Sequence, residues 1–407
     1  METAGGIVML AGAVLALLWA NSPWDSSYRD LFDTAIEFRI GDIVELDLSL
    51  HEWINDGLMS LFFLVVGLEI KRQLVHGELR DRRAAALPAL AALGGMIVPA
   101  ALYIVWNLGG ATNGFGVPVA TDIAFAVGVV TLAGSSVPLG VRIFILTLAV
   151  VDDIGGIVVI AIFYAEGVSM AWLAVGVASV VGAWAARRLE IRSLVPYVGL
   201  GIICWYSLHQ AGVEAAIAGV VFGLLTPAEP FHDPSRLGEG IETFVDHFDR
   251  SEHTVPTEIA AYVREVASPL DRIEHRLTPW VSFVIVPIFA IANAGVSVST
   301  TGLDMNVFMG VLTGLVLGKL LGVVAFTWLA VRLGVGRLPD RTTWSHVVAI
   351  GATAGIGFTV ALFVAGLSFD DPDLLRSAKL GILAASTAAG ILGYSLLRRS
   401  AKSDESV

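Results

Sequence analysis

Long apolar runs alternate with short polar stretches along most of the 407-residue chain. Many of the runs approach the roughly 20 residues that an α-helix needs to cross the ~30 Å hydrocarbon core of a bilayer. The pattern predicts twelve such segments, at residues 5–22, 53–71, 84–107, 117–135, 141–164, 169–187, 194–209, 212–226, 279–298, 306–332, 344–368 and 374–397. We therefore expect an all-α polytopic membrane protein that forms one membrane domain over residues 1–407.

Two polar excursions interrupt this pattern. Residues 44–50 alternate apolar and polar side chains, which is the period of a strand, and Gly41 just before them favours a turn. A small extramembrane β-hairpin is predicted at about 36–50. An isolated hairpin is marginal in water, so its edge either pairs with a second protomer or lies as a flap on the membrane surface. The second excursion, at about 227–278, is a long acidic loop in which a helix is expected over Pro256–Leu270.

The charge distribution supports this class and adds an orientation. Only 15% of the residues are charged, below the ~25% of soluble domains, and the net charge of −12 excludes a basic face for nucleic acid. If the N-terminus is cytoplasmic, the short inner loops and the C-terminal tail hold fifteen Lys and Arg and the outer side only four. We expect both termini in the cytoplasm and, because no basic region precedes it, a first helix that is retained.

Two adjacent carboxylates, Asp152 and Asp153, lie near the middle of the segment at 141–164. A charge at the bilayer centre costs roughly 2.5–3.5 kcal/mol, so two in succession indicate a function rather than a structural contact. Neighbouring residues on a helix point about 100° apart. One carboxylate can therefore face a cavity while the other faces a partner helix.

Lys319 is the one basic residue at membrane depth, in the segment at 306–332. A buried ammonium needs a carboxylate partner, and either Asp152 or Asp153 fits, because the two segments hold equivalent places in the chain. The alternative is that Lys319 extends to the membrane interface.

Two segments are interrupted at membrane depth. The fourth holds Pro118, Thr121 and Asp122, and the eleventh holds Gly355 and Gly357. Proline removes a backbone hydrogen bond, and irregular backbone is tolerated at this depth only beside protein or a cavity. Each interrupted segment is the middle of a triplet, segments 3–5 and 10–12. Equivalent segments of the two triplets are seven apart, an odd number, so the triplets enter the membrane from opposite sides. We expect two inverted repeats whose broken helices 4 and 11 cross at the substrate site.

These polar groups indicate cation transport. Asp122, Asp152, Asp153, Thr121 and freed carbonyls offer only oxygen ligands, which suit Na⁺ or Li⁺. Protons compete for the same oxygens, so a site that opens to one side at a time exchanges the two ions without a cofactor. If two protons replace one cation, net charge moves and the membrane potential drives the cycle. Either Lys319 or Asp152 carries the second proton.

Other classes fit less well. A sodium-coupled symporter of related fold remains the alternative. An intramembrane aspartyl protease using Asp122 and Asp153 leaves Lys319 and the paired interruptions unexplained, and a channel would be obstructed by a buried ion pair. None of the favoured classes is an enzyme.

Several strings of residues resemble the bacterial NhaA sodium/proton antiporters nearly from end to end. They are ATDIAFA at 120–126, AVVDDIG at 149–155, NDGLM at 55–59, FFLVVGLE at 62–69, ANAGV at 292–296, LGK at 317–319 and GIGFT at 355–359. The resemblance implies Na⁺ binding at Asp152 and Asp153, support from Thr121 and Asp122, and a pair between Lys319 and Asp152. It also implies the bacterial inner membrane and a homodimer formed through the outer hairpin.

The resemblance further implies regulation by pH. Glu69 and Glu274 match acidic positions of the family's cytoplasmic funnel, with His275 as a neighbouring candidate sensor. Gln73 departs from the pattern, which has a glutamate at this position, and Thr278 stands where a histidine is usual.

Overall fold

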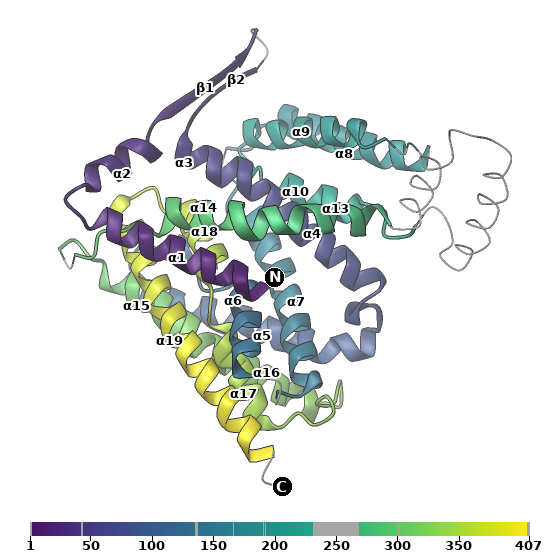
Figure 1. Cartoon of the computed structure of the whole chain (residues 1–407), viewed down its shortest axis with the longest axis vertical. Coiled ribbons are helices and arrows are strands. Elements are labelled where there is room, and N and C mark those ends of the chain that lie inside the picture. Colours follow the sequence, from purple (N-terminus) through teal and green to yellow (C-terminus); the bar gives the residue numbers. More distant parts are fainter. Residues whose placement is uncertain are drawn as a thin grey trace, which may run out of the picture.

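The computed structural model describes residues 2–41, 44–134, 137–165, 167–189, 191, 193–230, 268–299 and 301–404. Most of the long acidic loop, and residues 256–267 of the helix expected in it, lie outside this part. The described residues are mostly helical, with one two-stranded sheet (Figure 1).

The elements follow one another along the chain in this order. They are α1 (Glu2–Ala20), α2 (Asp25–Phe32), β1 (Ala35–Ile40), β2 (Val44–Ser49), α3 (Leu50–Glu52), the π-helix η1 (Trp53–Leu58), α4 (Met59–Val75), η2 (Glu78–Arg80), α5 (Arg82–Trp106), η3 (Thr112–Gly116), α6 (Ile123–Ala133), α7 (Leu139–Phe163), α8 (Met170–Arg188), α9 (Val195–Gln210), α10 (Ile217–Leu225), α13 (Pro269–Trp280), η5 (Val281–Ile285), α14 (Val286–Ala294), α15 (Met305–Thr313), η6 (Gly314–Gly318), α16 (Lys319–Arg332), α17 (Trp344–Ala354), α18 (Phe358–Ser368) and α19 (Pro372–Asp404).

Seven helices of the described part are long and apolar enough to cross a membrane, and nine if each of two bent pairs is one span. The bent pairs are α1 with α2, at 117°, and α17 with α18, at 46°. Three other predicted segments, at 117–135, 194–209 and 212–226, contain the shorter helices α6, α9 and α10. By length and composition, the structure thus confirms a mainly helical protein with many membrane-spanning candidates.

The predicted hairpin is present. Strands β1 and β2 pair antiparallel, with Ala35 opposite Ser49 and Ile40 opposite Val44, and Arg39 forms an ion pair with Glu45 across them. Figure 1 shows the hairpin projecting away from the helices, on the side of the molecule that we call the hairpin side. The prediction that it pairs with a second protomer stays a prediction.

Two helix starts differ from the sequence prediction. The second segment was predicted to begin at residue 53, but the helical run begins at Leu50. Ser49 and Glu52 form a capping box there, which satisfies the free amides one turn earlier. The acidic loop was expected to continue to 278, but α13 already starts at Pro269, with the Ser268 side chain as its cap.

Glycines bring α5 and α16 into close contact in the interior. A Cβ atom on Gly94 would collide with the carbonyl oxygen of Gly322, and one on Gly318 would lie 2.7 Å from the Cα atom of Pro99. The two backbones can approach this closely only because these side chains are absent. The contact buries Lys319, which directly follows Gly318.

Candidate ion site at the meeting of two broken helices

The two interrupted segments contact each other at their breaks. Between η3 and α6 the chain is irregular over residues 117–122, and between α17 and α18 it is irregular over residues 355–357. The Asp122 N–H donates to the Ile356 carbonyl at 2.6 Å, and the Thr121 hydroxyl donates to the Ala354 carbonyl at 2.8 Å. Each break therefore satisfies polar groups of the other, as irregular backbone inside a membrane requires.

The small and rigid residues at these breaks allow the segments to meet. A Cβ atom on Gly355 would collide with the Leu315 carbonyl oxygen, and one on Gly357 would lie 3.2 Å from the Ala120 carbonyl oxygen. Pro118 packs against Gly314 of η6, where an added Cβ would lie 2.8 Å from the proline ring. All three predicted support positions thus lie at the contact between the broken segments and their neighbours.

Asp122 connects the starts of two half-helices. Its Oδ1 accepts the Phe125 N–H of α6 at 3.2 Å, and its Oδ2 accepts the Thr359 N–H of α18 at 3.1 Å and the Thr359 hydroxyl at 2.6 Å. A carboxylate is favoured at helix N-termini, where free amides and the helix dipole both attract it. Both oxygens of Asp122 are thus engaged within the fold, which favours a positioning role.

Lys319 and Asp152 form an ion pair in the interior. The Lys319 ammonium donates to Asp152 Oδ2 and to the Val119 carbonyl, which belongs to the irregular stretch before α6. Both side chains are 0% exposed. The structure therefore chooses Asp152 over Asp153 as the partner of Lys319, and the alternative that Lys319 reaches the interface is wrong.

Asp153 lies beside this pair without being part of it. It is 9% exposed and makes no hydrogen bond to another described residue, while Asp152 and Asp122 repel its charge and Lys319 attracts it. Asp152 Oδ1 is also buried without a hydrogen-bond partner in the described part of the chain. Ionised carboxylate oxygens in such surroundings require a proton or a cation to balance them.

The charges of the site can be counted. Three carboxylates share one ammonium, so full ionisation would leave an excess of two negative charges inside the protein. Among the described residues, no three Asp, Glu, His or Cys side chains lie close enough together to hold a metal ion. This agrees with the engagement of both Asp122 oxygens within the fold.

The candidate pH-sensing residues lie apart from this site. Arg72 contacts Glu274 at 2.8 Å and also pairs with Glu69, whose other oxygen accepts the Gln73 amide at 2.9 Å. We call Glu69, Arg72, Gln73 and Glu274 the Arg72 cluster. His275 is exposed and is not part of this cluster in the described structure. The structure thus brings together two of the three predicted sensors.

Sequence reasoning missed two partners of the site. Thr359 is the second residue of α18, just after the second break. A hydroxyl group beside an interrupted helix was the sequence signal that could have predicted its contact with Asp122. The Val119 carbonyl carries no side-chain signal, because only the three-dimensional contact shows that it accepts from Lys319.

Comparison with known proteins agrees with this geometry. A family model described as "Na+/H+ antiporter 1" matches residues 1–397. The chain belongs to this family. Among similar members are Na(+)/H(+) antiporter NhaA 2 of Myxococcus xanthus, 45% identical over 99% of this chain and 89% of its own length, and NhaA of Rhodopirellula baltica, 44% identical over 98% and 92%. NhaA of Syntrophobacter fumaroxidans is 43% identical over 97% and 88%.

Membership of the Na+/H+ antiporter 1 family confirms the resemblance expected from the sequence. Together with the apolar helices it makes the chain a membrane protein that crosses the bilayer several times.

Proposed function

We propose that this protein exchanges Na⁺ or Li⁺ for protons across the inner membrane of a bacterium. The observation that carries the proposal is the fully buried ion pair between Lys319 and Asp152, beside Asp153, where two broken helices meet. Relatives that carry the name Na(+)/H(+) antiporter at 43–45% identity support the same activity.

Competition for the same oxygens couples the two ions. An arriving Na⁺ takes Asp153 and the unpartnered Oδ1 of Asp152, with neutral oxygens such as the Thr121 hydroxyl completing its shell. Its positive charge replaces that of protons on these carboxylates, so they dissociate. When the cation leaves, the buried charges again require protons, which return from the side to which the site is open.

The exchange moves net charge. Two protons leave for each monovalent cation, and the membrane potential then contributes ~2.3 kcal/mol per charge per 100 mV. Asp153 carries one proton. The second is carried by Asp152, which becomes protonated as Lys319 moves away, or by Lys319 itself.

Alternating access follows from the architecture that we propose. Twelve spans form two inverted repeats, segments 3–5 and 10–12, with both termini in the cytoplasm. The breaks beside α6 and between α17 and α18 support this arrangement, because they fall in the middle segment of each triplet. Rocking of the repeats against their neighbours opens the carboxylates to one side at a time.

Regulation by pH is proposed for the Arg72 cluster and the neighbouring His275. One guanidinium is shared there by two carboxylates, and Glu274 Oε2 is buried without a hydrogen-bond partner in the described part. Protonation of either carboxylate changes how α4 and α13 are held together. A homodimer that pairs the outer hairpins is proposed on the exposed edges of β1 and β2.

The test uses the purified protein in liposomes with an imposed pH gradient. Addition of Na⁺ or Li⁺ between pH 6 and 9 is expected to release the gradient, as dequenching of a pH-sensitive dye, without any organic solute. Asp370→Asn, at an exposed position, is a matched control that should behave as the wild type. Ion movement that requires an organic solute would replace the proposal with sodium-coupled symport.

A further inference from the structure

A second group of titratable side chains lies on the hairpin side and is not used by the ion site. Asp56 of η1 and His209 of α9 form a contact of 3.2 Å between Oδ2 and Nδ1. Trp205 donates to the Asp56 carbonyl at 2.9 Å, and its ring stacks between those of Trp53 and His209. The aromatic stack and the hydrogen bonds hold the histidine against the carboxylate.

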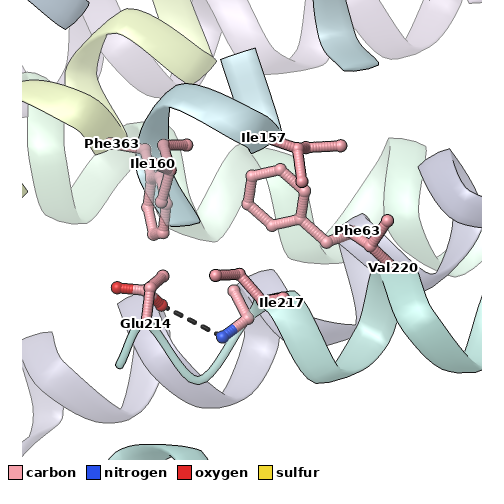
Figure 2. Close-up of a pocket in the computed structure, with 8 residues that line it drawn as sticks. Phe63, Ile157, Ile160, Glu214, Ile217, Val220 and Phe363 are labelled. Atoms are coloured by element: carbon pink, nitrogen blue, oxygen red, sulfur yellow. Dashed lines mark hydrogen bonds between the residues drawn. The ribbon is translucent and has the colours of Figure 1, made fainter. Parts of the chain in front are cut away.

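Glu214 belongs to this group and also faces a cavity. It lies in the turn between α9 and α10, where its Oε1 accepts the Ala216 N–H at 3.0 Å, and Asp56 and His209 both act on its charge. Figure 2 shows its carboxylate beside a small cavity that is otherwise lined by apolar side chains. The lining residues are Phe63, Ile157, Ile160, Ala216, Ile217, Val220 and Phe363. Glu214 is the one ionisable group of this lining.

The cavity lies on the face of α7 that also carries Asp153. Asp153, Ile157 and Ile160 are spaced i, i+4 and i+7, so their side chains share a helical face. Seven residues of helix correspond to about 10 Å between Asp153 and the level of Ile160. The cavity volume of about 10 Å³ is close to what one water molecule needs. The two isoleucines and the phenylalanines of its lining therefore close the path between Glu214 and Asp153 in the present conformation.

We propose that Glu214 is the group through which protons enter and leave the exchange route on the hairpin side. The inference rests on the proposed function and adds a residue to it. A proton from the hairpin-side solution passes the Asp56–His209 pair and binds the Glu214 carboxylate. When the apolar lining separates, water fills the cavity, and the proton moves from Glu214 to Asp153 while the cation leaves.

The surroundings of Glu214 suit this role. The charged groups that act on it are Asp56 and His209, while α7, α4 and α18 present only Ile157, Ile160, Phe63 and Phe363 to it. Glu52 acts on His209 from the same end of the molecule. A carboxylate between a polar entrance and an apolar closure can hold a proton until the closure opens.

The experiment compares the two sides of the membrane. Glu214→Gln keeps the size of the side chain and an oxygen for the Ala216 amide but removes the titratable proton. In right-side-out vesicles, whose bath faces the hairpin side, ²²Na⁺ efflux is expected to fall about tenfold, which is less than the ~10²–10⁴-fold contribution of a positioned acid–base group, and to lose most of its dependence on bath pH. In inverted vesicles the dependence on bath pH should keep its wild-type shape.

Three controls separate the explanations. Na⁺ affinity of the purified variant, measured by calorimetry, should stay within about twofold of wild type, because Asp152 and Asp153 are unchanged. Glu214→Asp should restore at least half of the lost rate, and Asp370→Asn should change nothing. If Glu214→Gln does not fold, Asp56→Asn carries the test, with the same flattened dependence on hairpin-side pH.

Two outcomes would contradict different statements. Wild-type dependence on hairpin-side pH in a folded Glu214→Gln or Asp56→Asn variant overturns the role of Glu214 while leaving the exchange itself intact. A wild-type protein that moves no protons against Na⁺ overturns the proposed function instead.

Discussion

Two carboxylate ion pairs of this protein use similar groups in opposite surroundings. The Lys319 and Asp152 side chains are 0% exposed, whereas the Arg72 side chain is 42% exposed and that of Glu274 14%. Water reaches the Arg72 guanidinium and can replace part of a lost contact there, and partly exposed pairs contribute only ~0–1 kcal/mol. No such replacement exists around Asp152, where an unpaired charge is strongly unfavourable.

This difference in exposure supports the different roles that we propose for the two ion pairs. At the fully buried Lys319–Asp152 pair, the charge of an arriving cation must be balanced by loss of a proton or by displacement of Lys319. This requirement couples the movement of the cation to that of the proton. At the partly exposed Arg72–Glu274 pair, solvent screens most of a change in charge. The Arg72 cluster is therefore suited to adjusting the rate of exchange and not to coupling the ions.

The largest effect is expected from Asp153→Asn. The variant keeps the shape of the side chain but loses the negative charge and the proton, so Na⁺-dependent proton release in inverted vesicles should fall at least ~100-fold. Glu274→Gln makes the matching change in the Arg72 cluster and should retain a maximal rate within about threefold. Exchange that survives in Asp153→Asn would remove this carboxylate from the mechanism.

Next in size is the loss of folding stability in Lys319→Met. This change leaves Asp152 buried without its cation and is expected to lower the free energy of unfolding by ~3–5 kcal/mol. Adding Asp152→Asn should recover most of that loss, because both charges are then absent. The measurement is the unfolding equilibrium of the purified variants in detergent. Additive losses in the double variant would mean that the two side chains stabilise the fold separately.

The sequence predicted the parts of the fold that depend on local pattern. Apolar runs located the helices, and Pro118 and the glycines at 355 and 357 located both breaks, because these residue types cannot continue a buried helix without compensation. It could not choose between Asp152 and Asp153 as the partner of Lys319 from the spacing alone. That choice depends on the rotation of α7 and α16 about their axes, which tertiary packing sets.

The misses have the same origin. The second segment was predicted from residue 53, but its helical run begins at Leu50 after the Ser49 cap, and Asp56 contacts His209 from a distant segment. For Asp122, the predicted role as an ion ligand stays a prediction, but its contacts within the fold were not foreseen from the sequence. Its hydrogen bonds from Thr359 depend on a contact between segments more than 200 residues apart, whereas the bond from the Phe125 N–H is the local cap of α6.

A smaller effect is expected from Thr359→Val, which removes the hydroxyl that donates to Asp122 Oδ2. One buried hydrogen bond to a charged group is lost while the backbone amide of residue 359 still donates, so unfolding should become easier by ~1–3 kcal/mol. Thr387→Val on α19 is the control, since its exposed hydroxyl bonds only its own helix, and it should stay within ~0.5 kcal/mol. Equal losses in the two variants would show that Asp122 does not hold the broken helices together.

The smallest change in stability is expected from Arg72→Gln, which tests the partly exposed ion pair directly. Solvent and Gln73 remain available to Glu69, so the free energy of unfolding should fall by less than ~1 kcal/mol, and high salt should reduce the difference further. The pH profile of exchange should nevertheless move, because the charge shared by Glu69 and Glu274 is gone. The profile is measured in liposomes at several pH values. A loss of unfolding free energy as large as that of Lys319→Met would show that the Arg72 cluster behaves as a fully buried ion pair. The proposed difference in role between the two ion pairs would then be wrong.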